Sequence, residues 1–408
     1  MKTLSAEIVM ILVSAYWMLT AAAWKALIPL LPVRGLLTRC RAAWFYFSAA
    51  VAATLCMVIM YLFHPQFSGS LRFLSYFWLN GLVMADLSVK LPLVFAFSLL
   101  LFVREEHRRL VISTMGVLLS AGVALLFLYS VVTGPGKART SEVTISFSSL
   151  PQAFDGFRIT QISDFHLGSS PSRALLKKMI RRSESFTPDV VVFTGDLVND
   201  RAWETRKWLS LLRQFRGKEG ELAITGNHDY GDYSHWNSPR ERELNFKGIE
   251  KAFGEGGFHL LQNENRVIVR NGDSLAFVGV GNRGEFPFPR YDDLETAERG
   301  LGDTPFRILL THDPAHWKEE VSGNLRYPLT LSGHTHGLQW GIHMAGMGFS
   351  MARAVRHHWG GLYRENGQYL YVNRGAGVIG MPYRIDMPPE ITLITLRKSA
   401  PSDTLRKR

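Results

Sequence analysis

VVVFTGDLVND, residues 190–200, joins a short run of apolar residues to a cluster of polar ones. The apolar run has the length and composition of a buried β-strand. Asp196 follows it and therefore lies just past the carboxyl end of the predicted strand. The sheets of α/β proteins place their functional sites at this end. The segment thus predicts an α/β domain with a site that contains Asp196.

Four further segments in the second half of the chain share this layout. They are ITQISDFHLG (159–168), LAITGNHDY (222–230), RILLTHDP (307–314) and LTLSGHTHG (329–337). Together the five segments supply side chains of the kinds that bind metal ions: Asp164, His166, Asp196, Asn227, His228, His312, His334 and His336. These donors are nitrogen and oxygen without cysteine, a set that suits Mn, Fe or Zn. The set is large enough for two divalent ions that share one carboxylate.

The spacing within the segments indicates how these side chains reach a common site. Asp164 and His166 are separated by one residue at a strand end, so they can point the same way. The alternation of His334 and His336 can send one ring to each ion. Asp196 follows a glycine, which lets the turn pass close to a metal, and its carboxylate can bridge two ions with one oxygen on each.

His228 has two possible roles. Its neighbour Asn227 supplies an amide oxygen and is the better placed ligand. A histidine beside a dinuclear site, with Asp229 adjacent to orient it, is suited to protonating a leaving alkoxide or stabilising a phosphoryl oxygen. The alternative is that His228 is itself a further imidazole ligand.

The series SDFH, GD, GNHD, THD and GHTHG resembles the calcineurin-like metallophosphoesterase superfamily, over about residues 150–398. This resemblance implies an α/β fold, a four-layer α/β/β/α sandwich, with a dinuclear centre. It implies that one ion is held by Asp164, His166, Asp196 and His336. The other ion would be held by Asp196, Asn227, His312 and His334. His228 would be the catalytic histidine, aided by Asp229.

The stretch YVNRGAGVIGMPYRIDMPPEITLITL, residues 371–396, narrows the resemblance to one branch. That branch includes transmembrane proteins with a metallophosphoesterase domain, the bacterial YkuE and YaeI phosphoesterases, and the chlamydial-type UDP-2,3-diacylglucosamine pyrophosphatase. One departure is Leu338, which stands where the branch more often has a second glycine. No ligand is lost by it, but the loop beside the site can differ in shape. Arg374 in this stretch can reach a substrate phosphate through its planar fork, or hold the glycine-rich turn.

Residues 1–133 are mostly apolar and predict an all-α bundle of about four transmembrane helices. The third apolar stretch, Phe73 to Val103, is long and carries Asp86, Lys90 and Pro92 midway. It is either an interfacial helix followed by one span or two short spans. Asp86 and Lys90 are spaced four residues apart, which favours an ion pair near the membrane interface.

Charge bias predicts the orientation in the membrane. With four spans, six basic residues lie on one side: Arg34, Arg39, Arg41, Arg104, Arg108 and Arg109. Four lie on the other side: Lys2, Arg72, Lys137 and Arg139. The positive-inside rule then makes the first side cytoplasmic and places both termini and the catalytic domain on the extracytoplasmic side of a cell (inner) membrane. A fifth span would invert this orientation.

The remaining segments follow from composition. Residues 134–149 are expected to be a linker and a first strand, residues 150–398 the catalytic domain, and residues 399–408 a basic tail. The net charge of +11 could suit nucleic acid, but the basic residues are scattered and form no stripe interleaved with aromatics. Five residues after the last ligand cluster can line a substrate pocket, although core or surface positions suit them better: Trp340, His343, His357, His358 and Trp359.

These features together predict a membrane-anchored hydrolase with two divalent metal ions that cleaves a phosphodiester or pyrophosphate bond by metal-activated water. The expected partners are the bilayer and a phosphate ester, with a lipid-linked UDP-2,3-diacylglucosamine type as one candidate. The alternatives are a broad phosphomonoesterase and an inactive membrane sensor or scaffold. Cys40 and Cys56, the two cysteines, both lie in the apolar half, so the catalytic half has no disulfide.

Overall fold

The computed structural model describes residues 6–31, 36–63, 70–136, 138–169, 172–284, 288–344, 347–350, 352 and 356–399. Its contacts divide the chain into two units. One contains the first 132 residues together with Gly380–Tyr383, and the other contains the rest. Residues 400–408 of the predicted basic tail lie outside the described residues, as do Lys2, Arg34, Lys137 and the side chain of His343.

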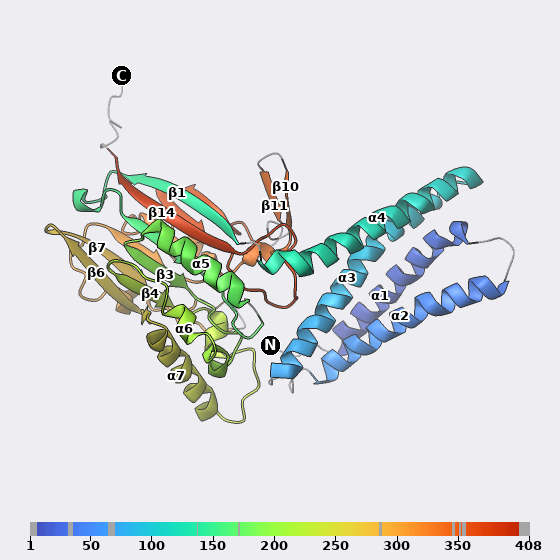
Figure 1. Ribbon diagram of the computed structural model, residues 1–408, viewed down its shortest axis with the longest axis horizontal. Helices are drawn as coiled ribbons and strands as arrows, with labels where there is room; N and C mark the ends of the chain where they lie inside the picture. The colour runs from blue at the N-terminus through green and yellow to red at the C-terminus, as the bar shows by residue number, and fades with distance from the viewer. Residues whose placement is uncertain are drawn as a thin grey trace, which may run out of the picture. The chain divides into compact units, whose positions relative to one another are not determined.

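The first unit is helical (Figure 1). Its long helices are α1 (Ala6–Leu27), α2 (Leu36–Phe63), α3 (Ser70–Leu100) and α4 (Glu106–Thr133). Each contains a segment long and apolar enough to cross a bilayer. Among the described residues there are four such helices, which confirms the predicted number and gives no fifth span.

The third apolar stretch differs from both predicted forms. It is one continuous helix, α3, with Pro92 inside it and a candidate span over Phe77–Leu100. The predicted pair of Asp86 and Lys90 is confirmed, with 2.6 Å between Oδ2 and Nζ. It lies within the span rather than near its end, and Tyr16 and Thr20 of α1 provide hydroxyl groups that bond to it. Tyr16 Oη donates to Asp86 at 2.9 Å and accepts from Lys90 at 2.9 Å.

The second unit contains two six-stranded sheets within the described residues (Figure 1). The first sheet, in spatial order, consists of β1 (Arg139–Phe147), β14 (Glu390–Lys398), β2 (Arg158–Ile162), β3 (Val190–Thr194), β4 (Gly220–Ile224) and β5 (His259–Leu260). The second consists of β12 (Gly361–Glu365), β13 (Gln368–Val372), β9 (Leu329–Ser332), β8 (Arg307–Leu310), β7 (Asp273–Gly279) and β6 (Glu264–Arg270). A separate hairpin is formed by β10 (Gly341–Met344) and β11 (Met347–Ser350).

All five apolar runs predicted as strands are strands: β2, β3, β4, β8 and β9. In the first sheet β2, β3 and β4 run parallel to one another, and in the second β8 and β9 are parallel. Parallel neighbours bring their carboxyl ends to the same edge of a sheet. The polar residues that follow these strands are therefore gathered at that edge.

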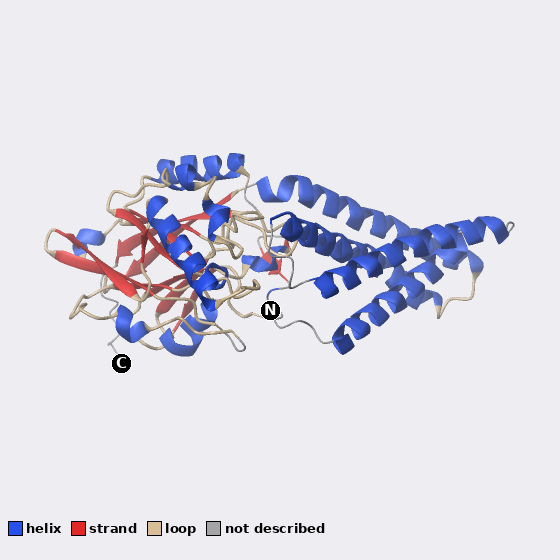
Figure 2. Cartoon of the chain, turned by 90° about the horizontal axis from the view of Figure 1, so that it is seen from below, coloured by secondary structure: helices blue, strands red, loops and turns tan. Residues whose placement is uncertain are grey.

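Three apolar layers separate four layers of structure. Strand β3 shows why its sequence is apolar throughout: Val191 and Phe193 face the helices, whereas Val190 and Val192 face the other sheet. Helices α5 (Arg173–Phe186), α6 (Leu209–Leu212) and α7 (Pro239–Glu255) cover the outer face of the first sheet. The outer face of the second sheet packs against α8 (Leu294–Ala297) and against the helical turn Trp317–Val321, which follows α9 (Pro314–His316). Figure 2 shows helices on both sides of the strands, so the unit is an α/β/β/α sandwich.

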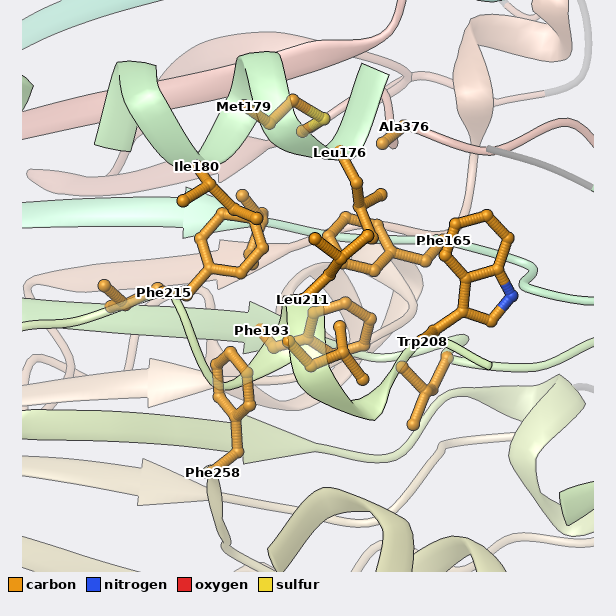
Figure 3. Close-up of a cluster of buried hydrophobic side chains, with 14 of the residues drawn as sticks. Phe165, Leu176, Met179, Ile180, Phe193, Trp208, Leu211, Phe215, Phe258 and Ala376 are labelled. Atoms are coloured by element: carbon orange, nitrogen blue, oxygen red, sulfur yellow. The ribbon is translucent and has the colours of Figure 1, made fainter. Parts of the chain in front are cut away.

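Helix α5 illustrates how the sequence fixes the layer on the first sheet. Ser172 caps its first turn by accepting from the backbone N–H of Leu175. Leu176, Met179 and Ile180 recur at helical spacing and are buried. Leu176 points toward Phe165 and Ile180 toward Phe215, and all three helix residues belong to the same apolar core (Figure 3). This core fixes the loop after β2, which carries the first polar cluster.

Candidate metal centre

The polar residues that follow β2, β3, β4, β8 and β9 converge on one cluster. The cluster contains three overlapping groups, and within each group the possible ligand atoms lie within 4.8 Å of one another. The groups are Asp164, His166 and His336; His166, Asp196 and His228; and Asp196, His312 and His334. Most of these side chains are buried, and Asn227, His228 and His334 are partly exposed. The cluster is therefore reached from solvent on the side of those three residues.

One half of the cluster is built around two imidazoles. The Nε2 atoms of His166 and His336 lie 3.0 Å apart. His336 Nε2 is also 3.3 Å from Asp164 Oδ1, and His166 Nε2 is 3.5 Å from Asp196 Oδ2. At most one proton can lie between the two nitrogens, whereas a cation at this point would accept both lone pairs.

The other half of the cluster also combines two imidazole nitrogens with side-chain oxygens. Asn227 Oδ1 is 2.8 Å from His334 Nδ1 and 3.1 Å from His312 Nε2. These two nitrogens are 3.3 Å apart, and His312 Nε2 is 3.2 Å from Asp196 Oδ2. Four donor atoms thus surround a second point.

Asp196 belongs to both halves through a single oxygen. Its Oδ2 is the atom near His166 Nε2 and near His312 Nε2. Its Oδ1 accepts from the backbone N–H of His228 at 2.9 Å. The sequence suggested one oxygen for each ion, but here one oxygen faces both halves because the other is committed to the backbone.

The backbone of the cluster is unusual. Five candidate ligands have left-handed backbone angles, with φ of 52° at Asp164, 46° at His166, 60° at Asp196, 72° at His334 and 50° at His336. Such angles are uncommon for residues with a side chain and collect at functional sites. They turn the chain sharply enough to send residues from one loop into the same centre.

Gly195 makes room for this arrangement. Its φ is +95°, and a Cβ at this position would lie 2.5 Å from His312 Nδ1. The missing side chain of Gly195 was expected to let the turn approach a metal ion. In the structure it makes room for the imidazole of His312, a neighbouring candidate ligand. His312 can then donate from Nδ1 to the carbonyl oxygen of Thr194 at 2.7 Å, which leaves Nε2 as its donor atom toward the cluster.

The charges of the cluster also fit a cation. Burial would raise the pKa of Asp164, but the imidazoles of His336 and His312 lower it to about 2. Burial would lower the pKa of His312, but Asp196 and Asp164 raise it to about 10. The carboxylates thus hold a proton on a histidine that, as a metal ligand, would be neutral. The donor set therefore fits divalent ions that replace this proton.

Two side chains outside the predicted set support the ligands from behind. Asp313 Oδ2 lies 3.4 Å from His334 Nε2, the nitrogen that faces away from the cluster. The fully buried guanidinium of Arg384 lies 2.9 Å from His336 Nδ1 and donates to the carbonyl oxygens of Arg374 and Gly377. Asp313 could have been found because it follows His312 directly. Arg384 carries no local sequence signal, since its partner is 48 residues away.

His228 is oriented by the backbone. Its Nδ1 donates to the carbonyl oxygen of Asn199 at 2.7 Å, so Nε2 is the nitrogen left for chemistry. The expected orienting partner was Asp229, and the structure corrects this expectation. A backbone carbonyl in the loop after β3 has that function.

Asp229 instead supports the loop that carries Asp196. Its carboxylate accepts four backbone N–H groups, from Gly226 at 2.9 Å, Asp196 at 3.0 Å, Leu197 at 2.9 Å and Val198 at 3.2 Å. With this many donors, the carboxylate cannot also turn toward the imidazole beside it.

We expect the Asp229→Asn variant to lose about 2–4 kcal/mol of stability, because an amide nitrogen would face backbone N–H donors in a buried position. Thermal unfolding of the full-length protein in detergent would measure this loss. An unchanged melting temperature would mean that these hydrogen bonds do not hold the loop.

Arg374 and His358, two further residues named from the sequence, have ion-pair partners outside the ligand set. Arg374 forms an ion pair with the buried carboxylate of Glu390 at 2.9 Å, which matches the structural alternative for this residue. Its role in substrate binding stays a prediction. His358 is buried and pairs with Glu365 at 3.0 Å.

A cavity of about 620 Å³ lies close to the cluster. Its lining includes Arg356, His357 and His358. Arg356 Nη2 is 3.4 Å from His334 Nε2, so the cavity adjoins one of the candidate ligands.

Comparisons with known proteins agree with this geometry. The model of the calcineurin-like phosphoesterase family matches residues 157–338. The metallophosphoesterase YkuE of Bacillus subtilis is 33% identical over 276 residues, which cover 65% of this chain and 87% of that protein. The transmembrane protein with metallophosphoesterase domain of Danio rerio is 30% identical over 287 residues, 68% of this chain and 61% of that protein.

A third relative has a named substrate. UDP-2,3-diacylglucosamine pyrophosphatase LpxG of Chlamydia trachomatis is 28% identical over 299 residues, 60% of this chain and 86% of that protein. Relatives that are membrane proteins, together with the four apolar helices, support a membrane protein. The matched segments and the sandwich around them show that the chain belongs to the calcineurin-like metallophosphoesterase family.

Proposed function

We propose that the protein is a membrane-anchored hydrolase that uses two divalent metal ions to cleave a phosphodiester or pyrophosphate bond. The observation that supports this most directly is Asp196 Oδ2, which lies 3.5 Å from His166 Nε2 and 3.2 Å from His312 Nε2. One carboxylate oxygen between two groups of nitrogen and oxygen donors is what a pair of ions with a shared ligand requires.

The residues divide between the two ions as follows. One ion would be held by Asp164, His166, Asp196 and His336, and the other by Asp196, Asn227, His312 and His334. These nitrogen and oxygen donors suit Mn, Fe or Zn. When bound, the ions would polarise the phosphate oxygens and activate a water molecule for attack on phosphorus.

The protein's own groups supply position and a proton. Asn227, His228 and His334 lie on the partly exposed side, where a phosphate group would enter. His228 is held at Nδ1 by Asn199, so its Nε2 would donate to the leaving oxygen or to a phosphoryl oxygen. During this proton transfer the buried carboxylate of Asp229 would hold the loop that carries Asp196.

Membrane anchoring favours a substrate at the bilayer surface. The similarity of this chain to LpxG makes a lipid-linked substrate of the UDP-2,3-diacylglucosamine type one candidate. The charge bias, however, favours an extracytoplasmic catalytic domain, where a nucleotide-linked substrate made in the cytoplasm would not reach it. A reporter fusion at the C-terminus distinguishes these two inferences, since a cytoplasmic reporter signal supports the nucleotide-linked substrate.

Hydrolysis assays with the full-length protein test the reaction class. We expect bis-p-nitrophenyl phosphate to be hydrolysed faster than p-nitrophenyl phosphate in the presence of Mn²⁺, and UDP-2,3-diacylglucosamine to release UMP if it is the substrate. Faster cleavage of the monoester would favour the broad phosphomonoesterase. No hydrolysis, with fewer than one metal ion per chain, would favour a scaffold.

A further inference from the structure

Tyr233 lies in the turn after the Asn227–Tyr230 segment and contacts two residues of the candidate centre. It was not among the residues that the sequence singled out. Its side chain is partly buried, and the two contacts involve different parts of it: the hydroxyl and the ring.

The hydroxyl holds the amide of Asn227. Asn227 Nδ2 donates to Tyr233 Oη at 2.8 Å, while Asn227 Oδ1 faces His312 and His334 on the opposite side. An amide nitrogen has only donors and cannot bind a cation, so the direction of this amide decides whether it is a ligand. A hydrogen bond from Nδ2 also increases the negative charge on Oδ1, because the amide is polarised along its length.

The ring packs on His228. The two ring centroids are 4.4 Å apart, and the planes are inclined by 18°, which is a stacked arrangement. His228 is thus held by the Asn199 carbonyl at Nδ1 and by the Tyr233 ring on its face. Both contacts limit rotation of the imidazole, so Nε2 keeps one direction.

We propose that Tyr233 is a positioning residue with two separable functions, in which the hydroxyl fixes the ligand oxygen of Asn227 and the ring fixes the imidazole of His228. This inference rests on the proposed function, since it assigns Asn227 to a metal ion and His228 to catalysis. Groups that orient a metal ligand typically contribute a factor of about 10–100 to metal affinity.

The two functions can be separated by substitution. The Tyr233→Phe variant keeps the ring and loses the hydroxyl, whereas Tyr233→Leu loses both. Tyr327→Phe is the matched control, because Tyr327 is a buried tyrosine whose hydroxyl bonds to Glu298 outside the cluster. Mn²⁺ binding is followed by electron paramagnetic resonance on the full-length protein in detergent, with turnover of bis-p-nitrophenyl phosphate measured beside it.

For Tyr233→Phe we expect the first Mn²⁺ to bind as in the wild type and the second to bind about 10–100-fold more weakly. Saturating Mn²⁺ should restore its kcat, because the stacked ring remains. Tyr233→Leu should show the same loss of affinity, with a kcat that stays about 10-fold or more below the wild type at saturating Mn²⁺. Tyr327→Phe should bind both ions as the wild type does.

Three results would overturn the inference. The first is unchanged affinity for both ions in Tyr233→Phe. The second is an equal weakening of both ions together with a lower melting temperature than in Tyr327→Phe, which would indicate a general loss of structure. The third is full recovery of kcat in Tyr233→Leu. A wild-type protein that binds no Mn²⁺ would instead contradict the proposed function itself, and the role of Tyr233 with it.

Discussion

The Asp196→Asn variant is expected to lose both metal ions and to hydrolyse bis-p-nitrophenyl phosphate at least about 1,000-fold more slowly than the wild type. One oxygen of Asp196 faces both halves of the cluster, so its replacement affects both ions together. An amide nitrogen at this point repels a cation and has no lone pair to offer. The two ions supply several kcal/mol of transition-state stabilisation, and each 1.4 kcal/mol is about a factor of ten in rate.

Metal content measured by mass spectrometry, with activity measured on the same sample, tests this expectation. The control is Asp303→Asn, an exposed carboxylate in the same unit. Loss of only one ion in Asp196→Asn would contradict the assignment of Asp196 as the shared ligand. The variant should keep its fold, because Oδ1 can be replaced by the amide oxygen as acceptor for the His228 N–H.

The second large effect is expected at His228. The His228→Ala variant should retain both ions and show a kcat lower by about 10²–10⁴-fold, the usual contribution of a positioned proton donor. The reason is geometric: His228 is bound at Nδ1 by the Asn199 carbonyl and lies on the partly exposed side of the cluster. The other seven residues supply the ligands without it.

The competing role for His228 gives a different result. If it is a ligand, His228→Ala loses an ion in proportion to its loss of activity, and added Mn²⁺ restores turnover. If it is catalytic, excess Mn²⁺ leaves kcat low. Comparing metal content and kcat over a range of Mn²⁺ concentrations therefore decides between the two roles that the sequence left open.

The strands and the gathering of the ligands could be predicted because both depend on local composition. Val190 to Thr194 is apolar on both faces, as a strand between two packed layers must be, and Asp196 follows it directly. The same reasoning applies to the other four runs. Parallel pairing then brings their ends together without further information.

The finer geometry could not be predicted, because it depends on contacts between distant residues. The spacing of Asp164 and His166 suggested alternation along a strand, but both residues have left-handed backbone angles in a loop. Asp229 was expected to orient its neighbour. Its carboxylate is instead directed to the backbone of the loop after β3, about 30 residues away in sequence.

The membrane unit gave a similar result. Composition was enough to predict its four apolar helices, and spacing was enough to predict the pair of Asp86 and Lys90. The hydrogen bonds of this pair with Tyr16 of another helix are indicated by no local pattern.

The central claim is that the chain binds two divalent ions in one cluster with a shared carboxylate. The most direct measurement is the Mn²⁺ stoichiometry of the full-length protein, with electron paramagnetic resonance to detect coupling between the ions. We predict two Mn²⁺ per chain with a spin-coupled signal that is lost, together with hydrolysis, on treatment with a chelator. Two uncoupled ions, or hydrolysis that survives removal of all metal, would contradict the account.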